Sequence, residues 1–372
     1  MRLASYNVEN LFHRAKVMNL ESWTEGRSTL ENFAALNALL GEKSYTAARK
    51  RRMVTLMIAL GLEASDKGPF VLLRRNRGAL LRRLAAGGIE IVAASRDDWV
   101  GSLELLVEPI NHEAIRNTAR VFGLIAADVL AVVEAENRPA LVNFNERVVK
   151  DVGGAPFDHV MLIDGNDERG IDVGILSRAN FAIGNMRSHV DDRSASAERI
   201  FSRDCPEYEI STPAGNTLVV LVNHLKSKGF GSQASSNERR RLQAARVRDI
   251  YDALSNSGRD MVAVLGDFND TPDSRPLAPL LEQTTLRDVF AHPAFDTGGF
   301  PGTFDNCSAS NKLDYILLSP ALFARVQTGG VVRQGVWPGV RPKKWPVLET
   351  LTQPIEAASD RSEERRVGKE CA

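Results

Sequence analysis

The sequence lacks the features that mark several classes of protein. Its three cysteines are widely separated and show no C-x-x-C spacing, so neither a disulfide framework nor a zinc site is indicated. The N-terminus has no signal-peptide pattern, and no apolar stretch is long enough to span a bilayer. Lys+Arg and Asp+Glu are equal at 47 each, so the net charge indicates no particular partner. We therefore expect a cytoplasmic protein with no membrane partner.

The composition is that of a globular protein with a substantial core, because 43% of the 372 residues are hydrophobic and 25% are charged. Short apolar runs that end in polar clusters predict buried strands, and helical patterns lie between them. This alternation favours an α/β layered fold. The predicted strands are Arg2–Val8, Val129–Val133, Asp172–Leu176, Leu218–Val222, Met261–Leu265 and Tyr315–Leu318, and the clearest predicted helix is Glu238–Leu254.

The segment from about 15 to 118 carries none of the polar clusters that follow the other apolar runs. It is rich in arginine, and we expect strands at Ile89–Ala93 and Leu103–Val107 within it. A helix is expected near Glu113–Leu124. We interpret this segment as an insertion after the first strand, and not as a separate domain.

Polar side chains stand at the ends of two predicted strands. Asp267 and Asn269 follow Met261–Leu265 two residues apart, so they point to the same side and can orient a water or hold a phosphate or metal. His224 follows Leu218–Val222, where an imidazole can contact a phosphate or protonate a leaving oxygen. Each cluster alone also has a plain structural explanation, since Gly, Asp and Asn form turns and a lone histidine is more often structural.

Two further acids occupy similar positions. Glu134 follows Val129–Val133, and a carboxylate at a strand end suits Mg²⁺, a hard ion that takes oxygen ligands and keeps its waters. Asp314 stands at the start of Tyr315–Leu318. Either one alone could be an ordinary surface acid, so their order along the chain decides how they are interpreted.

That order resembles the endonuclease/exonuclease/phosphatase (deoxyribonuclease I-like) superfamily. The resemblance covers residues 1–14 and about 119–360. The six motifs are Ala4–Phe12 with Asn7 and Asn10, then Glu134, Arg169–Val173, Asn223–Ser227, Gly266–Asp270 and Leu313–Ser319. The resemblance implies one domain, 1–360, that is a four-layer α/β sandwich: two packed, mainly antiparallel sheets flanked by helices, with the site at one rim.

The resemblance also implies roles for individual residues. Glu134 would bind Mg²⁺ or Mn²⁺ with Asn7 nearby, and Asp267 would activate the attacking water. Asn269 would hold the phosphate, and His224 would contact the phosphate or serve the leaving group. The remaining positions are Asn10, Arg169 and Asp172 on the substrate side, and Asp314, which would support the last catalytic histidine.

The final motif departs from the family pattern, which is Ser-Asp-His followed by a strand. Ser359 and Asp360 match the first two residues of this motif, and Asp360 is predicted to be catalytic, but Arg361 stands where the histidine belongs. Residues 361–372 carry no strand pattern, and Arg361–Cys371 resembles, codon for codon, the translation of a common short-read sequencing adapter. We therefore expect a non-native tail in place of the histidine and the closing strand. The alternative is a genuine charged tail on a diverged member of the family.

The leading interpretation of function is a metal-dependent phosphodiester hydrolase, a nuclease that acts on DNA or RNA. The arginines of the insertion and of Arg239–Arg241 could meet a phosphate backbone, or form an ordinary solvated surface. One alternative is a phosphatase or phosphodiesterase on a small phosphate ester or lipid, because the superfamily reuses one site for all of these. Another is a non-catalytic binding protein, which the missing histidine favours and the retained acids oppose.

Overall fold

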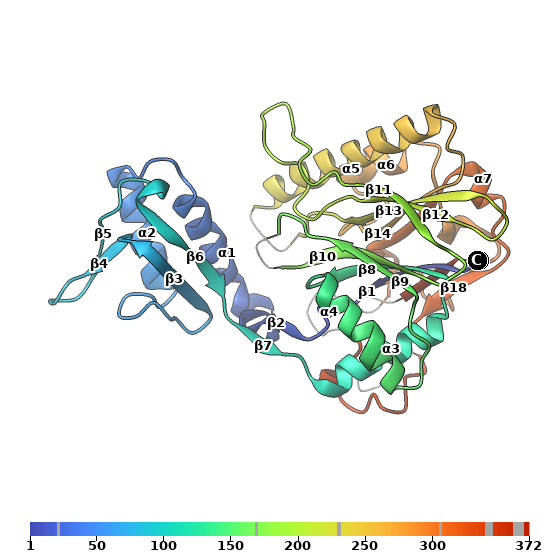
Figure 1. The fold of residues 1–372 in the computed structure, drawn as a ribbon, viewed down its shortest axis with the longest axis horizontal. Helices are drawn as coiled ribbons and strands as arrows, with labels where there is room; N and C mark the ends of the chain where they lie inside the picture. Colours follow the sequence, from blue (N-terminus) through green and yellow to red (C-terminus); the bar gives the residue numbers. More distant parts are fainter. Residues whose placement is uncertain are drawn as a thin grey trace. The chain divides into compact units, whose positions relative to one another are not determined.

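The computed structural model describes residues 1–20, 23–167, 170–228, 232–304, 307–338, 345–359 and 368–371 of the chain. The chain folds into two compact units. The sandwich unit comprises Met1–Phe12, Ile110–Lys228 and Ser232–Ala372, and the inserted unit comprises His13–Pro109. Both are drawn in Figure 1. None of the helices in these described ranges is long and apolar enough to cross a membrane.

Two sheets form the centre of the sandwich unit. The first has seven strands, in the order β16 (Phe295–Asp296), β18 (Gly329–Val332), β19 (Gly368–Cys371), β1 (Leu3–Asn7), β8 (Val129–Ala135), β10 (Asp172–Ser177) and β9 (His159–Ile163). The second has six, in the order β11 (Ile183–Arg187), β12 (Glu207–Ser211), β13 (Thr217–His224), β14 (Val262–Asp267), β17 (Asp314–Leu318) and β15 (Arg287–Asp288). Most neighbours are antiparallel; β1–β8, β13–β14 and β16–β18 are parallel.

Helices cover the outer face of each sheet (Figure 1). On the first sheet lie α3 (His112–Ile125) and α4 (Arg138–Asn143), and on the second lie α5 (Gln233–Asn256) and α6 (Ala278–Leu281). Val133, Val222 and Leu265 belong to the apolar core between the two sheets. Separate cores join each sheet to its helices, so the predicted four-layer α/β sandwich is confirmed.

Each strand that the apolar runs predict is present in these sheets, because a strand buried on both faces needs a nearly continuous apolar sequence. The helix expected near residues 113–124 is α3, and its N-cap Asn111 accepts a hydrogen bond from the Glu113 N–H at 2.8 Å. A short helix, α7 (Pro320–Phe323), follows β17.

The end of the chain differs from the expectation that residues 361–372 contain no strand. The backbone of Gly368–Cys371 forms β19, which pairs antiparallel with both β1 and β18. Ladder hydrogen bonds join backbone groups, so an extended segment can complete a sheet even where its side chains give no strand pattern. Asp360 and Arg361 lie outside the described residues.

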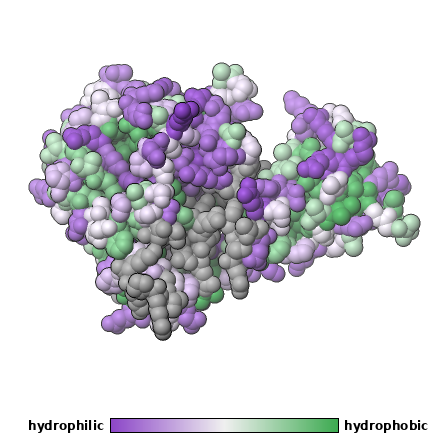
Figure 2. Space-filling view, turned by 180° about the vertical axis from the view of Figure 1, so that it is seen from behind, coloured by the Kyte–Doolittle hydropathy of each residue, from purple (hydrophilic) through white to green (hydrophobic). Residues whose placement is uncertain are grey.

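The inserted unit has a hydrophobic core of its own. Met53, Leu56 and Met57 of one helix pack there at helical spacing and are fully buried. In Figure 2, hydrophilic and hydrophobic residues lie side by side on its surface. Its elements are β2 (His13–Ala15), α1 (Trp23–Leu40), α2 (Ala47–Ala59), β3 (Val71–Gly78), β4 (Leu81–Arg83), β5 (Ile89–Ile91), β6 (Trp99–Leu105) and β7 (Val107–Pro109). The two expected strands are β5 and β6. The segment is nevertheless a compact unit, where the sequence predicts only an elaboration of a single domain.

Candidate metal centre at the rim of the sheets

Polar residues at the ends of five strands meet at one rim of the sandwich. Asn7 ends β1, which runs parallel to β8 and its Glu134. In the second sheet, His224 at the end of β13 is the register partner of Asp267 on β14. Asp267 is in turn the partner of Asp314 at the start of the antiparallel β17. The strand directions therefore bring these predicted site residues to the same edge.

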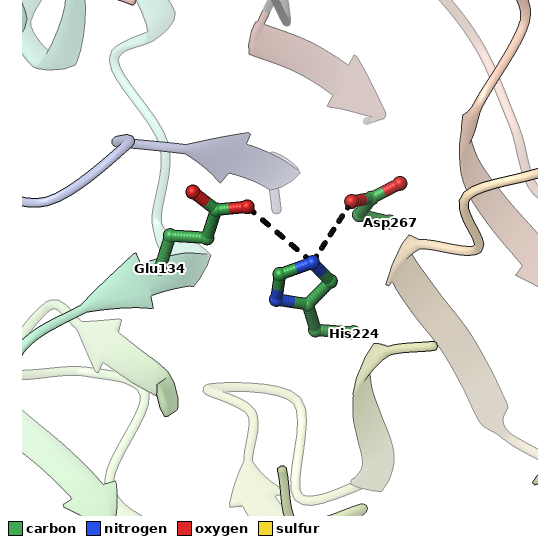
Figure 3. A group of neighbouring side chains, drawn as sticks. All are labelled: Glu134, His224 and Asp267. Atoms are coloured by element: carbon green, nitrogen blue, oxygen red, sulfur yellow. Dashed lines mark ion pairs between the residues drawn. The ribbon is translucent and has the colours of Figure 1, made fainter. Parts of the chain in front are cut away.

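Glu134, His224 and Asp267 form the centre of this site (Figure 3). The Nε2 atom of His224 lies 3.3 Å from Glu134 Oε1 and 3.2 Å from Asp267 Oδ2. All three side chains are buried, and their ligand atoms lie within 4.8 Å of one another. Within the described ranges this is the one group of three such residues with that spacing. Carboxylate oxygens and an imidazole nitrogen are common ligands of divalent cations, so this donor set fits one.

Backbone conformation at the site is unusual. Glu134, Asn10 and Asn269 adopt left-handed φ angles of 67°, 65° and 54°. Such angles are uncommon outside glycine, and strain of this kind clusters at functional sites. The Asn10 N–H donates to the Glu134 carbonyl at 2.8 Å, and the Asn269 N–H donates to Asp267 Oδ1 at 2.9 Å. These hydrogen bonds hold the turns in which the predicted site acids stand.

Asn7 offers a free donor near this group. Its Oδ1 accepts a hydrogen bond from the Glu9 N–H at 3.0 Å. Its Nδ2 is buried and makes no hydrogen bond to the described residues. A buried donor without a partner costs about 1–3 kcal/mol, so it is ready to bind an oxygen of a ligand or of a water.

Asp172 lies beside this edge of the first sheet, at a bulge where it is the register partner of Ala135. Its Oδ1 accepts a hydrogen bond from the Gly165 N–H at 2.7 Å. Burial raises the pKa of Asp172 to about 7, against the effect of that hydrogen bond and with a further contribution from Asp164 and Asp167. Asp172 therefore changes its charge near neutral pH. The neighbouring Arg169 is outside the described residues.

Asp314 is held by two residues that no sequence pattern identifies. Its backbone N–H donates to Thr303 Oγ1 at 3.1 Å, and its carbonyl accepts from Lys312 Nζ at 3.1 Å. Lys312 is buried, pairs with Asp288 at 2.6 Å and lies 3.5 Å from the centroid of the Tyr315 ring. Burial lowers the pKa of Lys312. Nothing in the sequence distinguishes this lysine from a surface lysine.

The basic run Arg239–Arg241 is only in part the exposed surface that its sequence suggests. Arg240 is fully buried, and its Nε lies 3.1 Å from Asp270 Oδ2. Lys228 pairs with the other oxygen of Asp270 at 2.6 Å. Arg241 pairs with Glu238 on the surface. The turn of α5 points Arg240 inward, so the interpretation is wrong for this residue.

The sequence matches the model of the endonuclease/exonuclease/phosphatase family over residues 109–339, more than half of the chain and including Glu134, His224 and Asp267. The protein belongs to this family. The resemblance drawn from the ordered motifs is therefore confirmed. No curated protein matches the sequence.

Several solved structures are similar to this family member at low identity. A mannosyl-6-phosphatase from Bacteroides thetaiotaomicron is 15% identical with a TM-score of 0.47, over 70% of this chain and 91% of that one. Truncated TDP2 from Caenorhabditis elegans is 14% identical with a TM-score of 0.45, over 69% of this chain and 90% of that one. The catalytic domain of human Nocturnin is 13% identical with a TM-score of 0.46, over 71% and 88%.

Proposed function

We propose that this family member is a divalent-metal-dependent phosphodiester hydrolase, and specifically a nuclease that uses Mg²⁺ or Mn²⁺. One observation carries the proposal: the buried Glu134, His224 and Asp267 cluster at the rim where the strands end. The family name covers nucleases and phosphatases alike. The cytoplasmic location stays a prediction from the sequence.

The donor set supports a metal centre. Glu134 and Asp267 supply the carboxylate oxygens that Mg²⁺ prefers, and His224 is a third ligand if the ion is Mn²⁺, which accepts imidazole more readily. When bound, such a cation acts as a Lewis acid that stabilises the charge on the phosphoryl oxygens. The free Nδ2 of Asn7 fits a hydrogen bond to one of those oxygens or to a water.

The remaining residues supply proton transfer and orientation. Asp267, when its Oδ2 is not a metal ligand, accepts the proton of the attacking water. The Asn269 N–H donates to Asp267 Oδ1, and this hydrogen bond holds Asn269 in position. His224, when it is not a metal ligand, contacts the phosphate or protonates the leaving oxygen. Asp314 and Asp360 keep the catalytic roles that the family resemblance implies. Asn10, Arg169 and Asp172 keep the substrate-binding roles that the same resemblance implies.

The proposal is tested with the purified chain and Mg²⁺ or Mn²⁺. The substrates are plasmid DNA, RNA, bis(p-nitrophenyl) phosphate as a small diester, and p-nitrophenyl phosphate as a monoester. We expect cleavage of nucleic acid and of the diester, with loss of about 10²-fold or more in kcat for Asp267→Asn, since a general base contributes about that much. Asp249→Asn, which removes an exposed carboxylate from α5, is the matched control.

The outcomes separate the proposal from its alternatives. Turnover of the monoester alone would favour a phosphatase and reject the nuclease. A folded protein that turns over none of the substrates with either ion would favour the non-catalytic binding protein.

A further inference from the structure

The inserted unit exposes a run of cations that its fold does not use. Helix α2 begins after Thr46, whose side chain accepts a hydrogen bond from the Arg49 N–H. Arg51 and Arg52 are exposed and Lys50 is half-buried. The charged groups of these three residues form no ion pair or hydrogen bond with any residue that the structure describes. We call Lys50, Arg51 and Arg52 the α2 basic cluster.

Three other arginines of the same unit differ, because each is paired with a neighbouring acid. These ion pairs are Arg74 with Glu104 at 2.9 Å, Arg75 with Asp66 at 2.6 Å and Arg82 with Glu90 at 2.5 Å. The unit as a whole contains 15 Lys and Arg and 11 Asp and Glu between residues 13 and 109. Its charge is therefore positive although the whole chain is neutral.

The α2 basic cluster does not contribute to the packing of its own helix. Lys50 lies at the end of the first turn of α2, where the helix dipole disfavours a cation, and that turn contains no acid. Arg51 and Arg52 lie in the next turn. The packing of α2 comes from Met53, Leu56 and Met57 on its buried face, to which the three cations do not belong. Charges that the fold neither pairs nor benefits from indicate an anionic partner.

We infer that the α2 basic cluster binds the phosphate backbone of a nucleic acid. Backbone contacts require only cations that reach phosphate oxygens, and they supply most of the non-specific affinity. An anionic membrane is the less favoured partner, because a helix that lies in a membrane inserts an apolar face, and α2 already buries its apolar face in the core. The inference deepens the proposed function, on which it rests for naming the substrate class.

The test measures binding with the full chain in EDTA, so that no cleavage occurs. One variant carries Lys50→Ala, Arg51→Ala and Arg52→Ala. The matched control carries Arg74→Ala, Arg75→Ala and Arg82→Ala, which removes the same charge from paired positions in the same unit. Fluorescence anisotropy of a labelled DNA duplex of about 20 base pairs is recorded between about 50 and 200 mM salt.

We expect the α2 variant to raise the Kd for the duplex by about 10-fold or more at the lowest salt and to reduce the slope of log K against log salt by about 2–3. The control should change the Kd less than about 2-fold, because its arginines are already neutralised. The midpoint temperature of thermal unfolding of the α2 variant should not be lower than that of the wild type. Equal weakening by the two variants would overturn the inference. Wild-type binding to phosphatidylserine vesicles and not to the duplex would also overturn it.

Hydrolysis of bis(p-nitrophenyl) phosphate with Mg²⁺ separates this inference from the proposed function. The small diester does not need an extended binding surface, so the α2 variant should turn it over at the wild-type rate. If neither protein hydrolyses it, the proposed function fails while the duplex measurement still decides whether the cluster binds nucleic acid. If both hydrolyse it and the α2 variant binds the duplex as the wild type does, only the inference fails.

Discussion

Asp172 makes the stability of the sandwich unit depend on pH in a direction that can be worked out. Burial raises its pKa in the folded protein from 3.8 to about 7. The folded state therefore holds the proton more tightly than the unfolded state does. This contribution to stability is fully present below the unfolded pKa and is lost as the pH rises through about 7.

The variant Asp172→Asn isolates this effect, because an amide keeps the shape and can still accept the hydrogen bond from the Gly165 N–H. Between about pH 5 and pH 8 the free energy of unfolding of the wild type should fall by roughly 2.5–3 kcal/mol relative to that of the variant, at about 1.36 kcal/mol per pKa unit. Urea unfolding followed by circular dichroism at both pH values measures the difference. Asp249→Asn, at an exposed position on α5, is the control and should show no such pH dependence.

The change with pH decides whether the pKa of Asp172 is raised in the folded protein. If the difference in unfolding free energy between wild type and Asp172→Asn is the same at about pH 5 and about pH 8, the carboxyl group is ionised in the folded protein throughout. A wild type that loses stability relative to Asp172→Asn as the pH falls would mean that the folded pKa of Asp172 is lowered.

Three further substitutions test other parts of the molecule. Gly266→Ala would place a Cβ 2.0 Å from the Asn223 carbonyl oxygen at a φ of 124°, so we expect a loss of several kcal/mol in urea unfolding. Arg240→Met removes one of the cations paired with the buried Asp270 carboxylate, so the free energy of unfolding should fall by about 3 kcal/mol in the same measurement. Arg361→His supplies the histidine of the family motif and should raise turnover of bis(p-nitrophenyl) phosphate about 10²-fold.

Each of these has a control and a contradicting result. Gly123→Ala, in open space on α3, should be neutral or stabilising; equal effects at the two glycines would exclude the clash as the cause. Arg241→Met, on the surface, should change stability by less than about 0.5 kcal/mol, and a match with Arg240→Met would contradict the buried pair. Unchanged turnover after Arg361→His would contradict the view that the missing histidine limits this chain.

The central strands and the centre of the site could be predicted because their signals are local. β8, β13 and β14 are buried on both faces, so each reads as an apolar run, and the acid or histidine that follows marks the end of the strand. The parallel pairing of β13 with β14 places His224 beside Asp267, and the packing of the two sheets brings Glu134 of β8 to the same rim. What no local pattern contains is the left-handed backbone at Glu134 that turns its side chain toward the others.

Other features depend on interactions between distant residues. Arg240 stands between two other arginines, and its charge can be buried because Asp270, 30 residues away, pairs with it. Lys312 is likewise fixed by Asp288 and by the ring of Tyr315. The inserted unit has helical apolar spacing at Met53, Leu56 and Met57, which indicates a buried face but not that the segment has its own core.

The central claim is that Glu134, His224 and Asp267 bind a divalent cation, and the most direct test is binding of Mn²⁺ followed by electron paramagnetic resonance. We predict one site in the wild type, lost in Glu134→Gln, which keeps the shape of the side chain and removes its charge. Glu136→Gln is the control, since Glu136 lies two residues away, accepts two backbone hydrogen bonds outside the cluster and should not be needed for the site. Equal Mn²⁺ binding by the wild type and Glu134→Gln would contradict the claim.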